Sequence, residues 1–365
     1  MRSEPSLQHL NTIGSGSYAH DDVHCLLRPI ELASTGLLEK ERLVQSRARH
    51  YSELISHELA PSSVVRAGFE QAMQQGVSRL AREVQALANG IAVQCPGPIV
   101  LVSLVRAGLP VGVLLRRALL QQGREVYHYG ISILRHRGID NLALEAVISR
   151  HGTHNLVFVD GWTGKGSISS ELEHSLSLDP RFDAVRLVVL ADPCGRAWMA
   201  ASAQDWLIPS SLLGATVSGL ISRSVWPDAK GLHACVVYGH LHAQDLTRDF
   251  VERVDRLRSR LGPQPPAAPW SASQLALLRA EATQALTFLM KHCHVQELDR
   301  IKPGIAEATR AVLRRIPERV LLHDHREADV QVLIQLAEEA GAMIETAGAA
   351  LGVYRAVTVL KGLAP

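Results

Sequence analysis

The sequence is poor in the features that mark secreted, membrane-spanning or metal-binding proteins. Its 365 residues include only five cysteines, and none are paired in the CxxC spacing of a zinc or redox site. An odd, dispersed set of thiols indicates reduced cysteines and favours the cytoplasm. No apolar run approaches the ~18 residues of a membrane span, and the N-terminus is polar and lacks a signal-peptide core. We therefore expect a cytoplasmic protein with no membrane partner.

A large net charge is also missing. The formal net charge is +2, with 20% charged and 47% apolar residues. Such a balance gives no global attraction to nucleic acid, so any contact with RNA would need a local basic patch. The length suits two or three domains with a substantial core.

The stretch from Asn155 to Ser167 is the most informative part of the chain. Four apolar residues run straight into Asp160, which is typical of a buried parallel strand. Three glycines then allow a tight turn that directs several backbone N–H groups to one point, and Ser167 is expected to cap the following helix. Strand, loop and helix start together predict a phosphate cradle. A carboxylate there repels phosphate, so Asp160 is expected to accept hydrogen bonds from ribose hydroxyls.

This loop resembles the one that binds phosphoribosyl pyrophosphate (PRPP) in type I phosphoribosyltransferases. Val159 departs from that family, which usually has a second acid there, and Lys165 stands where a small residue is usual. A Walker A interpretation fails because Gly166 follows Lys165 and position 159 is not glycine. A plain turn between strand and helix explains the local pattern about equally well. The resemblance implies PRPP contacts from Asp160, Gly161, Trp162, Thr163, Gly164, Lys165, Gly166 and Ser167.

Apolar runs alternate with helical spacing through the middle of the chain. Strands are expected over 98–104, 125–134, 155–159 and 185–191, and helices over 110–122 and 140–151 and after 167. This alternation predicts a parallel sheet with right-handed crossovers. Ligands bind such sheets beyond the carboxyl ends of the strands, where the loops after residues 103 and 159 would meet.

Two further loops would lie near the same edge. Ser103-Leu-Val-Arg-Ala-Gly-Leu-Pro110 resembles the pyrophosphate loop of phosphoribosyltransferases, with Arg106 as the catalytic partner of pyrophosphate. The resemblance implies contacts from Ser103, Ala107 and Gly108 as well. Arg135 and Arg137 would belong to a mobile hood over the phosphates. An exposed loop arginine and a solvated turn are the alternatives for these two loops.

Together with Gly16-Ser-Tyr-Ala19 and Thr216–Ser224, these motifs extend a resemblance over residues 13–363. The chain is similar to the phosphoribosyltransferase family encoded with bacterial tellurium-resistance and stress-response clusters. Members carry a C-terminal Pelota-type RNA-binding domain, and some are labelled StiP-type cysteine proteases. The resemblance implies transfer between PRPP and a nucleobase-like acceptor, or the reverse, in making a nucleoside-like metabolite. Mg²⁺ would arrive with PRPP, and no metal is expected on the protein alone.

The resulting fold class is α/β, with a type I phosphoribosyltransferase-like parallel sheet and a small C-terminal α/β/α Pelota/L7Ae-like domain. We expect a helical N-terminal region at 1–95, the core at 96–261, a Pro-rich linker at 262–270 and the C-terminal domain at 271–365. A helix over 63–88 should end at Asn89-Gly90. In the C-terminal domain, a basic edge that would meet RNA phosphates comprises Lys302, Arg310, Arg314, Arg315 and Arg319.

Two other functions stay open. A non-catalytic PRPP or nucleotide sensor, or an RNA-binding regulator, is favoured slightly by the missing second acid. A hydrolase using Cys25 is disfavoured, because neighbouring residues of the expected helical turn face apart and His24 could not activate the thiol. The polar group around His20–His24 is expected to cap that turn, and His233–His242 to be a core strand ending in a polar loop. The acceptor base and the oligomeric state, including a homodimer, are left open.

Overall fold

A parallel sheet of six strands forms the centre of the chain in the computed structural model, which describes residues 10–177 and 179–363. The strand order is β1-β4-β3-β7-β8-β9, and each neighbouring pair is parallel. The expected parallel α/β sheet is confirmed. Residues 1–9, on which the expectation of a polar N-terminus rests, lie outside the described residues. The strands are β1 (His24–Cys25), β3 (Ile99–Leu104), β4 (Val126–Ile131), β7 (Leu156–Val159), β8 (Leu187–Ala191) and β9 (Met199–Ser202).

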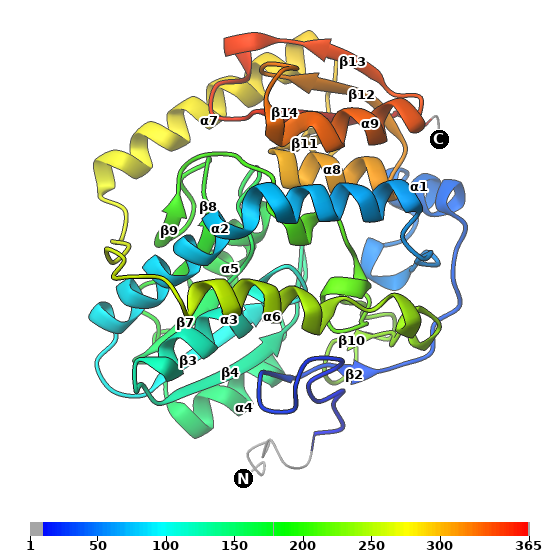
Figure 1. Cartoon of the computed structure of the whole chain (residues 1–365). Coiled ribbons are helices and arrows are strands. Elements are labelled where there is room, and N and C mark those ends of the chain that lie inside the picture. Colours follow the sequence, from blue (N-terminus) through cyan, green and yellow to red (C-terminus); the bar gives the residue numbers. More distant parts are fainter. Residues whose placement is uncertain (1–9, 178, 364–365) are drawn as a thin grey trace.

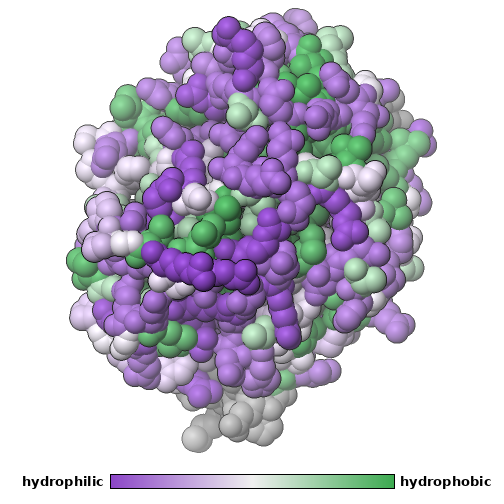
Figure 2. Space-filling model, viewed as in Figure 1, coloured by the Kyte–Doolittle hydropathy of each residue, from purple (hydrophilic) through white to green (hydrophobic). Residues whose placement is uncertain are grey.

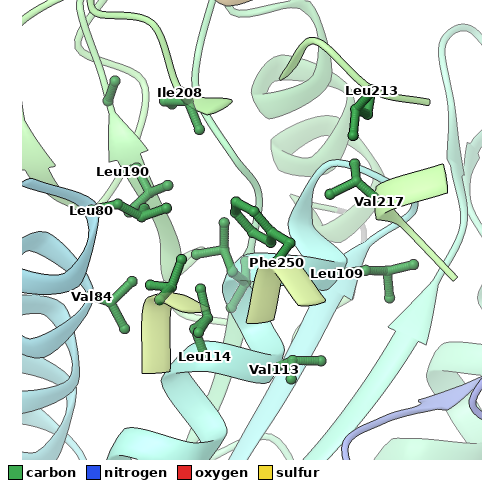
Figure 3. Close-up of a cluster of buried hydrophobic side chains, with 14 of the residues drawn as sticks. Leu80, Val84, Leu109, Val113, Leu114, Leu190, Ile208, Leu213, Val217 and Phe250 are labelled. Atoms are coloured by element: carbon green, nitrogen blue, oxygen red, sulfur yellow. The ribbon is translucent and has the colours of Figure 1, made fainter. Parts of the chain in front are cut away.

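Helices cover both faces of this sheet (Figure 1). Consecutive strand residues point to opposite faces, so Leu101 and Val102 belong to two separate apolar clusters, one on each face. Burial on both faces explains why the strands read as continuous apolar runs. Figure 3 shows part of the larger cluster, where Leu80, Leu190 and Phe250 gather. This cluster draws on α2 (Ser63–Gln94), α3 (Gly108–Gln121) and α6 (Thr247–Arg258), and the other on α4 (Asn141–His151) and α5 (Ser167–Ser177).

The helix α2 runs past the stop that the sequence predicts. It continues through Asn89-Gly90 to Gln94 and buries Ile91. A Cβ atom on Gly90 would lie 2.2 Å from the carbonyl oxygen of Ala267. Gly90 therefore permits close contact with the linker and does not end the helix. The linker itself is held there, since the Ala267 N–H donates to the Ala86 carbonyl at 2.8 Å.

The turn expected around His24 is a strand, so the helical prediction there is wrong. In β1, His24 pairs with Tyr129 and Cys25 with Gly130 of β4. The next two residues, Leu26 and Leu27, are both buried but belong to different apolar clusters, as the two-residue period of an extended chain requires. Shorter pairs are β2 (Arg28–Pro29) with β10 (Ala234–Cys235), and β5 (Ile133–Leu134) with β6 (Gly138–Ile139).

The C-terminal residues form a separate mixed sheet with helices, as expected. Its order is β11-β14-β12-β13, in which β12 and β13 are parallel and the other pairs antiparallel. The short strands β11 and β13 were not predicted. The elements are α7 (Ala272–His292), β11 (Ile301–Pro303), α8 (Ile305–Arg314), β12 (Pro317–Leu322), α9 (Gln331–Glu339), β13 (Met343–Thr346) and β14 (Ala356–Leu360). We call residues 271–363 the C-terminal unit.

The C-terminal unit is docked firmly on the core. Ile305 of α8 and Leu333 of α9 belong to the same apolar cluster as Phe69 of α2. The buried carboxylate of Asp205 accepts hydrogen bonds from the Ile305 N–H at 2.9 and 3.1 Å and from the Arg355 N–H at 2.8 Å. Figure 1 shows the unit stacked above the core, and a Cβ atom on Gly68 of α2 would lie 2.7 Å from the Val332 side chain of α9. Apolar burial and hydrogen bonds thus fix its position.

Hydrophilic residues cover most of the face seen in Figure 2, and the hydrophobic patches between them are small. Within the described residues, none of the helices is both long and apolar enough to cross a bilayer.

Candidate functional site

A cavity of about 1110 Å³ lies between the carboxyl edge of the sheet and the C-terminal unit. The loops after β3 and β7 form one side of it, as the position of the strand ends predicts. Residues of β11 and α8 form the opposite side. The segments that line it are 40–51 in part, 104–107, 133–136, 160, 162–169 and 296–315 in part, with Arg223. Gly161, which was expected to contact the ligand, is not among them.

Asp160 stands directly after β7 and lines the cavity. Its carboxylate is half-buried and accepts a hydrogen bond from the Gly161 N–H at 2.8 Å. Burial raises the pKa of Asp160 to about 7, against that hydrogen bond and the positive charge of Arg310. Asp160 is therefore a carboxyl group that changes charge near neutral pH.

In the first part of the glycine loop a backbone N–H group is hydrogen-bonded to the sheet, whereas in the second part the N–H groups are free of any described acceptor. The Thr163 N–H donates to the Ala191 carbonyl at 2.9 Å, which ties the loop to β8. In contrast, within the described residues we find no acceptor for the backbone N–H groups of residues 164–167, all of which line the cavity. The helix α5 begins at Ser167, so Ser167 is its first residue and not its cap, and Gly166 before it has φ of +84°. Free N–H groups at a helix start are the components of an anion site.

The C-terminal unit lies directly over this loop. The Lys165 ammonium donates to the Leu298 carbonyl at 2.7 Å and to Asp299 at 2.9 Å. A Cβ atom on Gly164 would lie 3.1 Å from the Pro303 carbonyl oxygen. Glycine at 164 thus also accommodates the C-terminal unit, which the loop pattern alone did not indicate.

The loop after β3 brings only part of its predicted set to the cavity. Arg106 and Ala107 line it, whereas Ser103 and Gly108 do not. Ser103 is fully buried and contacts His128 Nε2 at 2.7 Å. A Cβ atom on Gly108 would lie 2.1 Å from the Val159 carbonyl oxygen, so this glycine allows α3 to start against β7. The expectation that Ser103 and Gly108 contact the ligand is therefore corrected, because both are packing residues.

Arg106 is held by protein groups. Its guanidinium donates to Glu58 at 3.0 Å and to the Ile221 carbonyl at 2.6 Å. Burial alone would raise the pKa of Glu58, but Arg106 and Arg314 hold it at about 2. The sequence reasoning missed Glu58, since a lone glutamate in a loop carries no pattern.

The two arginines of the expected hood differ. Arg135 lines the cavity and pairs with Asp299 at 2.8 Å. Arg137 does not line it, and donates to Glu53 and to the Trp226 carbonyl. Arg135 therefore stays a predicted member of the hood, whereas the expectation that Arg137 belongs to it is corrected.

The basic edge predicted to meet RNA faces the cavity instead. Lys302, Arg310, Arg314 and Arg315 all line it, because docking turns this side of α8 toward the glycine loop. Arg319 lies elsewhere, 3.8 Å from Glu345. Four of the five residues predicted to contact RNA thus lie on the cavity wall, and their RNA contacts stay a prediction.

All five cysteines are buried, and none lines the cavity. Cys25 is 1% exposed, and burial raises the pKa of its thiol well above the usual range. The neighbouring His24 ring contacts Thr12 Oγ1 at 3.0 Å. A thiol in this state is not an activated nucleophile. In the described parts of the chain, no three His, Cys, Asp or Glu side chains are grouped to hold a metal ion.

Comparison with known proteins shows the family to which the chain belongs. The family described as "Tellurite-like stress resistance cysteine protease StiP" matches residues 16–255, and the PELOTA RNA binding domain matches residues 280–362. The "Cysteine protease StiP" of Acinetobacter baylyi is 46% identical over 363 residues, covering 96% of this chain and 94% of that protein. The chain belongs to the StiP family. The family resemblance drawn from the sequence is confirmed.

Two solved structures are similar to part of this StiP-family chain. Hypoxanthine phosphoribosyltransferase from Trypanosoma cruzi with IMP is 18% identical, with a TM-score of 0.24, over 34% of this chain and 67% of that one. The HGPRT-ase from Leishmania tarentolae with GMP is 15% identical, with a TM-score of 0.23, over 38% of this chain and 72% of that one.

Proposed function

We propose that this StiP-family protein transfers a phosphoribosyl group between PRPP and a nucleobase-like acceptor. The observation that carries the proposal is the juxtaposition at one sheet edge of Asp160, the unpaired N–H groups of residues 164–167 and the guanidinium of Arg106. A diol, a terminal phosphate and a pyrophosphate need these three kinds of partner. The product would be the nucleoside-like metabolite implied by the stress-response resemblance.

In this reaction the bond from ribose C1 to the pyrophosphate oxygen breaks and a bond from C1 to an acceptor nitrogen forms. The acceptor nitrogen loses its proton, and the bonding electron pair leaves with pyrophosphate. C1 becomes cationic between these events, so charge placement and positioning provide most of the catalysis. Asp160 would hold the diol and oppose the developing positive charge. The loop N–H groups would hold the 5-phosphate and Arg106 the pyrophosphate.

Mg²⁺ belongs to the proposal as a part of the substrate complex. It binds oxygen ligands and keeps several waters, so pyrophosphate oxygens are its natural carriers. Asp160 is the carboxylate beside the loop that fits such a complex, since it is half-buried and lines the cavity. The ion would neutralise the leaving group.

Titration with Mg²⁺ and PRPP by calorimetry, followed by assay of pyrophosphate release with a panel of bases, tests the proposal. PRPP should bind more tightly than ribose 5-phosphate or pyrophosphate alone, because it engages both loops. If none of the three binds, the proposal is overturned. If PRPP binds but no base gives turnover, the protein is a non-catalytic PRPP sensor. Val159, where a second acid would stand, supports that alternative.

A cysteine hydrolase is the activity named for the Acinetobacter relative. No observation at the cavity favours it here, because all five thiols lie away from it and are buried. Binding of RNA by the C-terminal unit is supported by its PELOTA match. Such binding would have to use a surface other than the cavity wall of α8.

A further inference from the structure

The cavity has room for more than the groups that the sheet side would hold. Its volume of about 1110 Å³ lies at the upper end of the range usual for a ligand pocket, roughly 300–1,000 Å³. The glycine loop and Arg106 occupy only the sheet side. The side formed by the C-terminal unit remains without an assigned role.

Three charged side chains on that side make no hydrogen bond or ion pair with another described residue. Glu307 and Arg310 are three residues apart on α8 and so project from the same face, and Lys302 precedes them on β11. Within the described residues, none of these three side chains makes a hydrogen bond or an ion pair, although all three line the cavity. Lys302 is only 6% exposed. Glu307 and Arg310 are half-buried. Buried charges normally have partners, so unpaired Lys302, with two half-buried unpaired charges beside it at a cavity, indicates a ligand.

Most other cations around the cavity behave differently. Arg106 pairs with Glu58, Arg135 with Asp299 and Arg315 with Glu41. Lys40 also lines the cavity without a hydrogen bond or ion pair to a described residue, so what marks the wall above the glycine loop is the grouping of three such charges. Burial lowers the pKa of Lys302 to about 7, and the charges that act on it come from several elements. They are Glu307, Arg135, Lys165 and Arg315, while Asp299 is in turn affected by Lys302.

An aromatic plane completes this part of the cavity. The Arg310 guanidinium carbon lies 5.4 Å from the centre of the Trp162 ring. Trp162 belongs to the glycine loop, so the two sides of the cavity meet here. An indole face beside a guanidinium suits a flat ring.

We propose that Lys302, Glu307, Arg310 and Trp162 form an acceptor subsite for a planar heterocycle that carries an anionic group. The ring would lie against Trp162, its anionic group would pair with Arg310 and Lys302, and Glu307 would accept a ring N–H. This inference rests on the proposed function for the role of the ring as acceptor. The C-terminal unit thereby becomes a wall of the binding site, and α8 determines its specificity.

Two matched pairs of probes test this subsite. Orotate differs from uracil by a carboxylate, and AMP differs from adenosine by a phosphate. Calorimetry measures the affinity of each probe for the full chain, with and without Mg²⁺ and PRPP. The variants are Arg310→Gln and Lys302→Met, and Arg319→Gln is the control on the same unit but outside the cavity. Thermal melting establishes that each variant is folded.

In at least one pair, the anionic probe should bind wild type about tenfold or more tightly than its neutral partner. This ratio should fall toward one in Arg310→Gln and in Lys302→Met, and persist in Arg319→Gln. The pair that shows the ratio identifies the anion as carboxylate or phosphate. Ratios near one for both pairs in wild type, no binding of any probe, or ratios unaltered in both cavity variants would overturn the subsite.

The same titrations separate this inference from the proposed function. If PRPP binds but anionic and neutral probes bind alike, the subsite fails and phosphoribosyl transfer stands. If the anionic ratio holds while PRPP does not bind, the subsite stands as a site for anionic rings and phosphoribosyl transfer fails.

Discussion

The two sides of the cavity differ in the kind of group that they present. The sheet side offers backbone N–H groups of residues 164–167 and a guanidinium, Arg106, already neutralised by Glu58. The C-terminal side offers charged side chains, Glu307 and Arg310, that make no hydrogen bond or ion pair with another described residue. Backbone groups recognise a phosphate whatever it is attached to, whereas unpaired side chains discriminate among ligands. The difference suggests a shared substrate on one side and a selective partner on the other.

The two sides also differ in how they are held. The glycine loop is fixed by its own strand and by β8, through short segments of one sheet. The C-terminal wall keeps its place only because the whole unit is docked on the core, with Asp205 accepting from Ile305 and Arg355. Loosening that docking should change one side of the cavity and spare the other.

Removing the Asp205 carboxylate should have the largest effect. Asp205→Ala leaves the buried N–H groups of Ile305 and Arg355 without their acceptor, which we expect to cost about 3 kcal/mol in the free energy of unfolding. Urea unfolding measures this loss. Asp205→Asn keeps one acceptor oxygen and should lose less, and the exposed control Asp183→Ala should lose almost nothing. Equal stabilities for Asp205→Ala and wild type would mean that apolar packing alone holds the unit.

Neutralising Asp160 should act on turnover more than on binding. Asp160→Asn keeps the shape of the side chain but removes the charge that opposes the developing cation. A loss of ~2–3 kcal/mol in transition-state stabilisation is typical of one such group, which is roughly a hundredfold in rate. Pyrophosphate release measures the rate and calorimetry the affinity for PRPP, with Asp183→Asn as the matched control. An unchanged rate would exclude Asp160 from the reaction.

The pH dependence of kcat/KM should follow Asp160 as well. Burial raises the pKa of this carboxyl to about 7, and the charged form is the one that acts. The rate should therefore rise with pH, level off above about 7, and fall about tenfold per pH unit below it. Asp160→Asn should lose this inflection while any ionisation of the substrate persists. An inflection that survives in Asp160→Asn would belong to another group.

The sheet side of the cavity could be predicted from the sequence, and the C-terminal side could not. The parallel sheet, the loop after β7 and the separate C-terminal unit follow from local patterns, since apolar runs, glycines and a Pro-rich segment act over a few residues. The inward orientation of α8 does not, because the same basic spacing suits a solvated face and a cavity wall alike. Docking on the core, through apolar contacts and Asp205, decides between them, and neither the partners of these contacts nor a single aspartate can be recognised in the sequence.

Contacts between segments distant in sequence also explain the wrong predictions for two glycines and for the segment around His24. Gly90 and Gly108 read as a helix stop and a ligand contact, yet each permits a neighbouring carbonyl to approach. The turn assigned around His24 is a strand because its pairing with β4 is distant in sequence. Local propensity carries no information on such partners.

The smallest effect is expected at Cys25, which lies on neither side of the cavity. Cys25→Ala removes a buried sulfur next to Gly130 and should lower stability slightly, while turnover should stay within about twofold of wild type, a change of under ~0.5 kcal/mol. Labelling with iodoacetamide at neutral pH should be slow in the folded chain, because burial keeps the thiol protonated. The unfolded chain, in which the thiol is exposed, provides the fast reference.

The opposite result would reinstate the hydrolase. Rapid labelling of folded Cys25, together with a loss of activity in Cys25→Ala at an unchanged melting temperature, would show an accessible and activated thiol. Cys235→Ala is the matched control, since Cys235 is also buried and its pKa is also raised by burial. If both variants lose activity equally and both melt earlier, the cause is packing in this part of the core. Only a loss of activity in Cys25→Ala that Cys235→Ala does not share would show that the reaction takes place outside the cavity.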